Sequence, residues 1–287
     1  MAQIINGKLI SATIREEITL EVKDFVAKYG YAPGLAVIIV GNNPASQVYV
    51  RNKKKACEEV GFHSEVYELD ENTTNEELLA LIDKLNCDDK IHGILTQLPL
   101  PAHLDEKGII LNIDPKKDVD AFHPENVGKI MIGDYSFLPC TPAGVMELIA
   151  RTGIDVAGKN CVVIGRSNIV GKPMAMLLLH ANGTVTVCHS KTANIKEICR
   201  SADILVASVG KANFVGADMV KEGAVVIDVG INRMEDGKLC GDVDFANVMP
   251  KASYITPVPG GVGVCTIAML MQNTLTAAKR QNKLIGD

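Results

Sequence analysis

Polar side chains that could carry chemistry lie at three places in the first half of the sequence. Tyr49 and Lys53 are four residues apart in a segment of helical character, so both project from one face. Gln97 directly follows a buried apolar run, at the carboxyl edge of a sheet where doubly wound folds place ligands. Asp120 ends a long irregular stretch. The same residues also suit structural roles, as an exposed lysine beside a half-buried tyrosine and as a turn carboxylate.

A glycine-bearing loop in the second half could hold the phosphates of a dinucleotide. An apolar strand ends at Ile164, and Gly165 then permits a tight turn and a close approach of backbone to a pyrophosphate. Pro173 suits the first turn of a helix whose free N–H groups bind phosphate oxygens. The loop is not a strict G-x-G-x-x-G, because Ser167 takes the second glycine position and Gly171 comes late. A purely structural strand-to-helix turn is therefore the alternative.

The strand after this loop discriminates between the two nicotinamide dinucleotides. NAD-preferring sites commonly place a carboxylate roughly twenty residues after the loop, where it holds the ribose 2′-hydroxyl. Here Cys188 is followed by His189-Ser190-Lys191-Thr192, with no carboxylate. Arg166 can reach the same region from the glycine loop. Cationic and hydroxyl donors such as Arg166 and Ser190 suit a 2′-phosphate, so the sequence predicts NADP as the cofactor.

The elements that position these groups alternate between helix and strand. In the first half, apolar periodicity and turn residues predict helices over 8–29, 44–60 and 74–85 and strands over 35–41, 63–69 and 91–96. This order predicts a parallel sheet with helices on both faces. Residues 98–142 are rich in Pro and Gly, so we expect an irregular, functional stretch with a domain boundary near its end; a plain linker is the alternative.

The second half repeats the alternation in a doubly wound, nucleotide-binding pattern. Strands are predicted over 159–165, 184–188, 203–208 and 224–229, and helices over 172–181, 194–201 and 266–279. The last helix is expected to pack back on the first domain. The fold class predicted from the whole pattern is α/β with two domains.

Composition excludes several classes of protein. The net charge of −5 gives no reason to expect nucleic acid or an anionic membrane as partner. No apolar run is long enough to span a bilayer, and the first residues lack the layout of a signal peptide, so we expect a cytoplasmic protein. Eight scattered cysteines without a C-x-x-C pair argue against a zinc site and for reduced core thiols.

Six segments, in order along nearly the whole chain, resemble the methylenetetrahydrofolate dehydrogenase/cyclohydrolase family. Three resemble the folate-site signatures, namely Ser46-Gln47-Val48-Tyr49-Val50-Arg51-Asn52-Lys53-Lys54-Lys55-Ala56, His92-Gly93-Ile94-Leu95-Thr96-Gln97-Leu98-Pro99-Leu100-Pro101 and Lys117-Asp118-Val119-Asp120. Three resemble the cofactor-domain signatures, namely Gly165-Arg166-Ser167 through Pro173, Cys188-His189-Ser190-Lys191-Thr192 and Pro257-Val258-Pro259-Gly260-Gly261-Val262-Gly263.

The resemblance implies two reactions in a cleft between the domains. Methylenetetrahydrofolate would be oxidised with NADP to the methenyl cation, which would then be hydrolysed to 10-formyltetrahydrofolate. It implies a catalytic folate-binding domain over 1–140, on which a helix over 267–287 packs back, and a Rossmann-like NADP-binding domain over 141–266. A homodimer is the family expectation. Because the irregular stretch and the glycine loops carry the signatures, both are expected to be functional.

The resemblance also assigns roles to residues. Lys53 would be the central catalytic group, made neutral by burial beside a cation, with Gln97 orienting it and Tyr49 positioning the folate. Asp120 would bind the N–H pair of the pterin ring, and Pro259-Gly260-Gly261 would let backbone approach the folate. The cofactor residues would be Gly165, Arg166, Ser167, Gly171, Ser190 and Ile231.

One segment departs from the family pattern, and two rival functions stay open. Where the family usually reads Gly-Pro-Met-Thr, this chain has Gly263-Val264-Cys265-Thr266, which loses a proline and its restriction of φ. We do not interpret Cys265 as a nucleophile, because neither reaction needs a covalent enzyme intermediate. The rivals are a dehydrogenase of the same family without the hydrolysis step and a non-catalytic dinucleotide sensor, whose cleft would not require Lys53 and Asp120.

Overall fold

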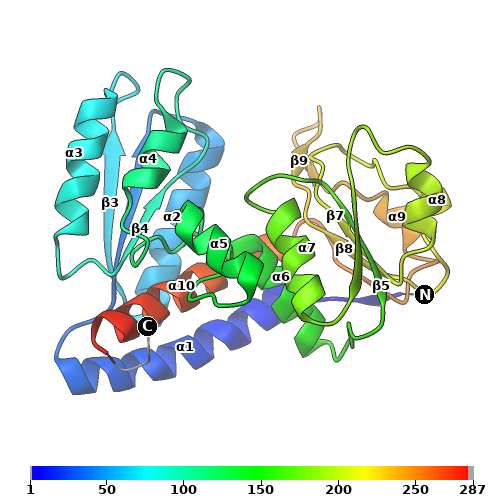
Figure 1. Ribbon diagram of the computed structural model, residues 1–287, viewed down its shortest axis with the longest axis horizontal. Helices are drawn as coiled ribbons and strands as arrows, with labels where there is room; N and C mark the ends of the chain where they lie inside the picture. Colours follow the sequence, from blue (N-terminus) through cyan, green and yellow to red (C-terminus); the bar gives the residue numbers. More distant parts are fainter. Residues whose placement is uncertain (1, 284–287) are drawn as a thin grey trace. The chain divides into compact units, whose positions relative to one another are not determined.

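The computed structural model describes residues 2–283, and the chain forms two compact units (Figure 1). Unit 1 contains Met1–Ala12 and Thr141–Thr266, and unit 2 contains Thr13–Cys140 and Ile267–Asp287. The first residues thus lie with the second half of the chain, whereas we expected all of 1–140 in one domain. The reason is a parallel pairing of β1 (Gln3–Ile4) with β11 (Tyr254–Ile255).

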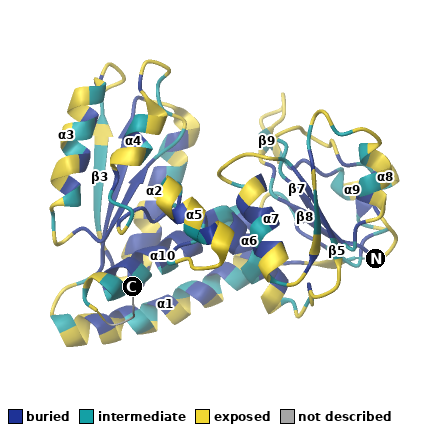
Figure 2. Cartoon of the chain, in the orientation of Figure 1, coloured by how far each residue is buried: buried dark blue, intermediate teal, exposed yellow. Residues whose placement is uncertain are grey.

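Unit 2 is built on a three-stranded parallel sheet. The strand order is β3 (His63–Leu69), β2 (Gly34–Val40), β4 (Gly93–Thr96), so β2 is central and every one of its residues is buried. On one face, Ile38 and Ile94 pack against α3 (Asn75–Asn86) and α4 (Glu106–Asn112). Strands β2 and β4 are buried throughout, whereas Figure 2 shows β3 as mostly of intermediate burial. The predicted parallel α/β sheet is confirmed.

Helix α2 (Pro44–Val60) presents the candidate catalytic residues, and its ends follow from local sequence. The side chain of Asn43 accepts hydrogen bonds from the backbone N–H groups of Ala45 and Ser46, and Pro44 occupies the first turn. Gly61 ends the helix in the left-handed conformation at φ 84°. These ends match the prediction, and the helix directs Lys53 to its buried side.

The expectation of an irregular stretch over 98–142 was wrong in part. It contains α4 and α5 (Pro124–Ile132), and α6 (Cys140–Arg151) begins at its end. In α5 the proline stands in the first helical turn, where its missing N–H costs nothing, and His123 Nδ1 accepts from the N–H of Glu125. Proline therefore starts a helix here, where the sequence analysis took it as a breaker.

Unit 1 is a six-stranded, entirely parallel sheet in the order β1-β11-β8-β7-β5-β6. Its longer strands are β5 (Asn160–Ile164), β6 (Thr184–Cys188), β7 (Ile204–Ala207) and β8 (Val225–Asp228), of which β6 forms one edge of the sheet. The chain leaves β5 toward β6 and then returns to β7 on the other side of β5. This topological switch point, at the carboxyl ends of β5 and β7, is where doubly wound sheets bind ligands. The predicted doubly wound fold is confirmed.

Shorter elements complete unit 1. They are α7 (Gly171–His180), α8 (Ile195–Arg200), the 3₁₀ turn η1 (Ala217–Met219), β9 (Asn232–Arg233), β10 (Leu239–Cys240) and α9 (Phe245–Val248). The strand pair β9–β10 is antiparallel and separate from the main sheet. One apolar core joins β5, β7 and β8 to residues of these flanking elements.

The last helix begins earlier than the sequence indicated. Helix α10 spans Val262–Gln281, so Val264 and Cys265 lie within its first turns. The Cys265 thiol is buried and donates to the carbonyl oxygen of Gly7, and the Ser11 hydroxyl donates to the carbonyl oxygen of Val264 at 2.9 Å. Intrahelical and side-chain bonds therefore hold this segment without the family proline. Residues 284–287 of the predicted helix lie outside the described residues. Among the helices that the structure describes, none has the length and apolar character that a membrane span requires.

The buried His92 predicts a stability that depends on pH. Its side chain is 1% exposed, its Nδ1 accepts from the N–H of Gly34 at 2.9 Å, and burial lowers its pKa from 6.5 to about 4. In the unfolded chain His92 binds a proton near pH 6.5, whereas in the native protein it stays neutral. Native stability contributed by the neutral ring is therefore present above pH 6.5 and is lost as pH falls to about 4, by about 3 kcal/mol.

Urea unfolding between pH 7 and pH 4 measures this loss. The variant His92→Asn keeps an acceptor for the Gly34 N–H and removes the titrating group, so its profile should be flatter than that of the wild type by about 3 kcal/mol. His103→Asn, at an exposed histidine whose Nε2 lies 3.0 Å from the carbonyl oxygen of Thr73, is the matched control. Equal profiles for the wild type and His92→Asn would contradict the assignment.

Candidate active site

Lys53 and Gln97 meet at the carboxyl edge of the sheet in unit 2. Lys53 comes from the buried side of α2 and is only 8% exposed, while Gln97 follows the last residue of β4. The Lys53 ammonium donates to Gln97 Oε1 at 3.0 Å, and Gln97 Nε2 donates to the carbonyl oxygen of Leu98 at 2.8 Å. The amide of Gln97 is thereby fixed in orientation, with its oxygen toward the lysine.

Burial is the largest cause of the shifted pKa values of Lys53 and Asp120. Burial lowers the pKa of Lys53, and the negative charge of Asp120 opposes that shift. Burial raises the pKa of Asp120, and the positive charge of Lys53 lowers it. A lysine with a lowered pKa has a larger neutral fraction at neutral pH, which a proton acceptor requires. The structure thus brings Lys53, Gln97 and Asp120 into one group.

The segment carrying Asp120 is supported by two residues that the sequence analysis missed. The Cys140 thiol lies 3.4 Å from Asp120 Oδ1 and is fully enclosed. Asn273, on α10, donates from Nδ2 to the carbonyl oxygens of Val119 and Leu138, both at 2.8 Å. In the sequence Asn273 is one of several polar residues in the last helix, so its role could be recognised only from the fold.

Tyr49 lies one helical turn before Lys53 on α2 and is half-buried. Burial raises the pKa of its hydroxyl, so the phenol is neutral at physiological pH. Its ring is a partly exposed apolar surface on the same side of the helix as Lys53. That arrangement suits packing against a planar ligand.

The glycine loop of unit 1 lies at the switch point of the sheet. Gly165 has φ 131°, and a Cβ at this position would lie 2.4 Å from the carbonyl oxygen of Ser208. A Cβ on Gly171 would lie 2.3 Å from the carbonyl oxygen of Gly165. Both glycines are therefore required by contacts within the protein itself, in addition to any approach of a phosphate. The Ser167 hydroxyl accepts from the N–H groups of Val170 and Gly171, which shapes the turn into α7.

Arg166 and Ser190 follow the ends of neighbouring strands. Ile164 of β5 is in register with Cys188 of β6, and the Gly165 N–H donates to the carbonyl oxygen of Cys188 at 2.9 Å. Arg166 and Ser190 are each two residues beyond this register pair and are exposed. The fold thus places a guanidinium and a hydroxyl at one edge, with no carboxylate in the loop 189–192. This donor set fits a 2′-phosphate.

The remaining candidate residues of unit 1 lie in two loops. Ile231 follows β8 and is 45% exposed. Pro259, Gly260 and Gly261 lead into α10, and Gly260 has φ 105°. A Cβ on Gly261 would lie 2.6 Å from the carbonyl oxygen of Pro257, so the tight turn alone requires a glycine there.

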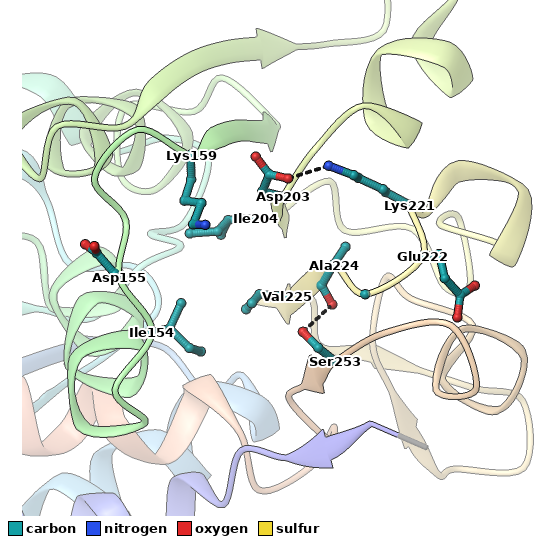
Figure 3. Close-up of a pocket in the computed structure, with 11 residues that line it drawn as sticks. Ile154, Asp155, Lys159, Asp203, Ile204, Lys221, Glu222, Ala224, Val225 and Ser253 are labelled. Atoms are coloured by element: carbon teal, nitrogen blue, oxygen red, sulfur yellow. Dashed lines mark hydrogen bonds and ion pairs between the residues drawn. The ribbon is translucent and has the colours of Figure 1, made fainter.

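A separate hollow lies at the opposite, amino edge of the unit 1 sheet (Figure 3). It is lined by residues that precede the strands, including Lys159, Asp203 and Ser253. Lys221 is paired with Asp203 at 2.5 Å, and the Ser253 hydroxyl donates to the carbonyl oxygen of Ala224, as the dashed lines show. These two interactions occupy polar groups in the hollow, which lies at the edge opposite the glycine loop, so we assign it no part in the site.

Together these features define a class of protein. Unit 1 has the topology and glycine loop of a dinucleotide-binding fold. Unit 2 gathers a buried lysine, an amide and a carboxylate at the carboxyl edge of a parallel sheet. The class is a nucleotide-linked α/β enzyme with two domains.

Comparison with known sequences identifies the family. Residues 5–120 match the catalytic domain of tetrahydrofolate dehydrogenase/cyclohydrolase, and residues 139–282 match the NAD(P)-binding domain of the same enzymes. The Bifunctional protein FolD of Acetivibrio thermocellus is 65% identical over 283 residues, covering 99% of this chain and 99% of that protein. The chain belongs to the tetrahydrofolate dehydrogenase/cyclohydrolase family, as its six sequence segments indicated.

Solved structures agree. The bifunctional methylenetetrahydrofolate dehydrogenase/cyclohydrolase FolD of Campylobacter jejuni is 54% identical, with a TM-score of 0.95 over 98% of this chain and 100% of that one. The Trypanosoma brucei enzyme, complexed with NADP cofactor and inhibitor, is 42% identical, with a TM-score of 0.94 over 98% and 99% of the two chains. The NAD-dependent 5,10-methylenetetrahydrofolate dehydrogenase of Saccharomyces cerevisiae is 22% identical and shares the fold, with a TM-score of 0.83 over 98% of each chain.

Proposed function

We propose that this chain oxidises 5,10-methylenetetrahydrofolate to 5,10-methenyltetrahydrofolate with NADP and hydrolyses the product to 10-formyltetrahydrofolate. Family membership along nearly the whole chain supports both activities. The observation that carries the second activity is the buried Lys53, hydrogen-bonded to Gln97 and electrostatically coupled to Asp120. A dinucleotide sensor would have no use for this group of residues.

The oxidation step needs positioning more than acid–base catalysis. A C–H bond of the methylene bridge breaks, and the lone pair of a folate nitrogen forms the C=N⁺ bond of the methenyl product. Bound NADP supplies the acceptor for the hydride. The chain's contribution is to fix the folate, with Tyr49 packing against its planar part and the carboxylate of Asp120 accepting from the pterin N–H pair. In the loop Pro259-Gly260-Gly261, the two glycines leave backbone accessible for contact with a ligand.

The hydrolysis step needs a proton acceptor. Water adds to the methenyl carbon and loses one proton. The resulting hydroxyl loses its second proton as it becomes the formyl C=O, and the carbon–nitrogen bond that closes the ring breaks as that nitrogen takes up one proton, so one proton is released overall. Neutral Lys53 accepts the proton of the attacking water, and the cationic substrate favours its neutral form further. Gln97 orients the amine through the hydrogen bond at 3.0 Å.

We assign NADP binding to the carboxyl edge of unit 1. Gly165, Ser167 and Gly171 form the turn into α7, whose N-terminal N–H groups suit phosphate oxygens. Arg166 and Ser190 suit the 2′-phosphate, and Ile231 lines the next loop. Because an NAD-dependent enzyme shares this fold, the donor set, and not the topology, supports the choice of NADP.

Assays of the separate half-reactions test the proposed function. Purified protein with 5,10-methylenetetrahydrofolate should reduce NADP faster than NAD at equal subsaturating concentrations, and with added methenyltetrahydrofolate it should accelerate loss of methenyl absorbance without any nucleotide. Reduction without accelerated hydrolysis would identify a monofunctional dehydrogenase. No reaction above the blank in either assay would overturn the enzyme proposal.

We further propose a homodimer in the cytoplasm. Strand β6 is an edge of the unit 1 sheet and exposes Thr184 and Val187, so its backbone groups are open to pairing with a second copy. All eight cysteines are free thiols, as a reducing compartment maintains them. Light scattering during size-exclusion chromatography should give twice the mass of one 30.8 kDa chain.

A further inference from the structure

Two carboxylates in unit 1 are buried without a cationic partner. Asp228, the last residue of β8, is 3% exposed, and Asp242 is fully buried. Among the ion pairs of the described residues, none includes either side chain. Burial raises the pKa of Asp228 to about 6, and the neighbouring charge of Asp242 raises it as well. Such a pair is costly to bury, so its contacts need an explanation.

The carboxylate of Asp242 accepts hydrogen bonds from the backbone of the loop after β7. Its Oδ2 accepts from the N–H groups of Val209 at 2.6 Å and Gly210 at 3.0 Å. Its Oδ1 accepts from the N–H of Lys211 at 2.8 Å and from Asn232 Nδ2 at 3.0 Å. Only a carboxylate offers two oxygens without a donor, so no other side chain can receive four N–H groups in this way.

Asp228 connects that arrangement to the loop after β8. Its Oδ1 accepts from the N–H groups of Gly230 at 3.0 Å and Asp242 at 2.9 Å, and its Oδ2 accepts from Val243 at 2.9 Å. The glycines are matched to this packing. A Cβ on Gly230 would lie 2.2 Å from Asp242 Cγ, and a Cβ on Gly241 would lie 1.8 Å from Asp228 Oδ2.

The two loops adjoin or contain residues of the proposed cofactor site. Ser208, whose hydroxyl donates to the carbonyl oxygen of Ile164, packs on Gly165 and directly precedes the N–H groups that Asp242 binds. Ile231 stands between Gly230 and Asn232, which donate to Asp228 and Asp242 respectively. The carboxylate pair therefore fixes the residues on both sides of Ile231 and the residues next to the glycine loop.

We propose that Asp228 and Asp242 act as positioning residues for NADP, holding the loops 208–211 and 229–232 in the conformation that binds the dinucleotide. This inference rests on the proposed NADP site. The pair does not contact the cofactor itself, because it is enclosed by backbone N–H groups. The pair holds the two loops in one conformation before NADP binds. Without it, part of the binding free energy would be spent on ordering the loops, and the affinity for NADP would be lower.

The test is Asp242→Asn in the full chain. The amide would direct an N–H donor at backbone donors, so the loops should lose their common acceptor. We expect the KM and the Kd for NADP to rise about 30-fold, with kcat at saturating NADP within about threefold and nucleotide-free hydrolysis of methenyltetrahydrofolate retained. Asp244→Asn, two residues further along and partly exposed as a cap of α9, is the matched control with unchanged NADP affinity.

A milder variant covers the case in which Asp242→Asn does not fold. Asn232→Ala removes one of the four hydrogen bonds to Asp242, and we expect NADP affinity to fall about fivefold. A purely structural role would lower the melting temperature and leave the KM for NADP unchanged. If every folded variant binds NADP within twofold of the wild-type affinity, this inference is overturned and the proposed function is not affected. A wild-type protein that does not bind NADP in direct titration overturns the proposed function and, with it, this inference.

Discussion

Lys53→Met should abolish accelerated hydrolysis of methenyltetrahydrofolate, with a loss of about 1000-fold or more, and leave NADP binding intact. Methionine has similar length and no titrating group, so the site loses its proton acceptor and the hydrogen bond to Gln97. The buried position should tolerate the change, because an apolar side chain replaces one whose pKa is lowered by burial. The decay of methenyl absorbance in the absence of nucleotide measures the effect.

Lys54→Met is the matched control for this variant. Lys54 is the next residue of α2 and is exposed, so the same substitution is made in the same helix without touching the site. Its rates should equal those of the wild type. Hydrolysis by Lys53→Met within tenfold of the wild-type rate, with normal folding, would refute the role assigned to Lys53.

Ser190→Asp should reverse the preference for NADP over NAD. A carboxylate at this position would repel a 2′-phosphate beside Arg166 and could accept a hydrogen bond from a 2′-hydroxyl. We expect the KM for NADP to rise about 100-fold, equivalent to roughly 3 kcal/mol, while the KM for NAD stays equal or falls. Initial rates of methylenetetrahydrofolate oxidation with each nucleotide give both constants.

Thr184→Asp separates this local effect from a general effect of charge. Thr184 is exposed at the first residue of β6, at the amino end of the strand that Ser190 follows. The same charge placed there should leave both Michaelis constants unchanged. A wild-type KM that is lower for NAD than for NADP would contradict the assignment of NADP at the outset.

Most of the framework around the site follows from local sequence. The apolar run 34–40 is buried on both faces, and the Asn43-Pro44 pair starts α2 where the side-chain pattern indicated. These two elements alone fix which side of the helix carries Tyr49 and Lys53. Likewise both strands were predicted from the sequence, and the register of β5 with β6 places Arg166 and Ser190, which follow them, at one edge of the sheet.

Contacts between distant segments were not accessible from one sequence. Asn273 and Cys140 both contact the chain around Asp120. Asn273 lies more than a hundred residues away from Asp120 in the sequence, and no local pattern reports such a pairing. Asp228, within a predicted strand, and Asp242 were not recognised from the sequence, because their burial and the convergence of N–H groups on them appear only in the folded chain. The pairing of β1 with β11 was missed because each strand has only two residues.

The helices within 98–142 were missed for a different reason. Proline and glycine were taken as signs of irregular backbone, yet Pro124 starts α5 and Gly133 ends it with φ 81°. The same two residue types punctuate short helices at their ends and loops along their length. Only capping contacts, such as that of His123 with the Glu125 N–H, distinguish the two cases.

One product analysis tests the central claim, that a single chain performs both reactions in sequence. The protein is mixed with 5,10-methylenetetrahydrofolate and NADP, and NADPH, methenyltetrahydrofolate and 10-formyltetrahydrofolate are quantified over time. The proposed function predicts that 10-formyltetrahydrofolate appears faster than the uncatalysed hydrolysis permits, with the sum of the two folate products equal to NADPH. Methenyltetrahydrofolate that accumulates in step with NADPH and decays only at the uncatalysed rate would contradict it.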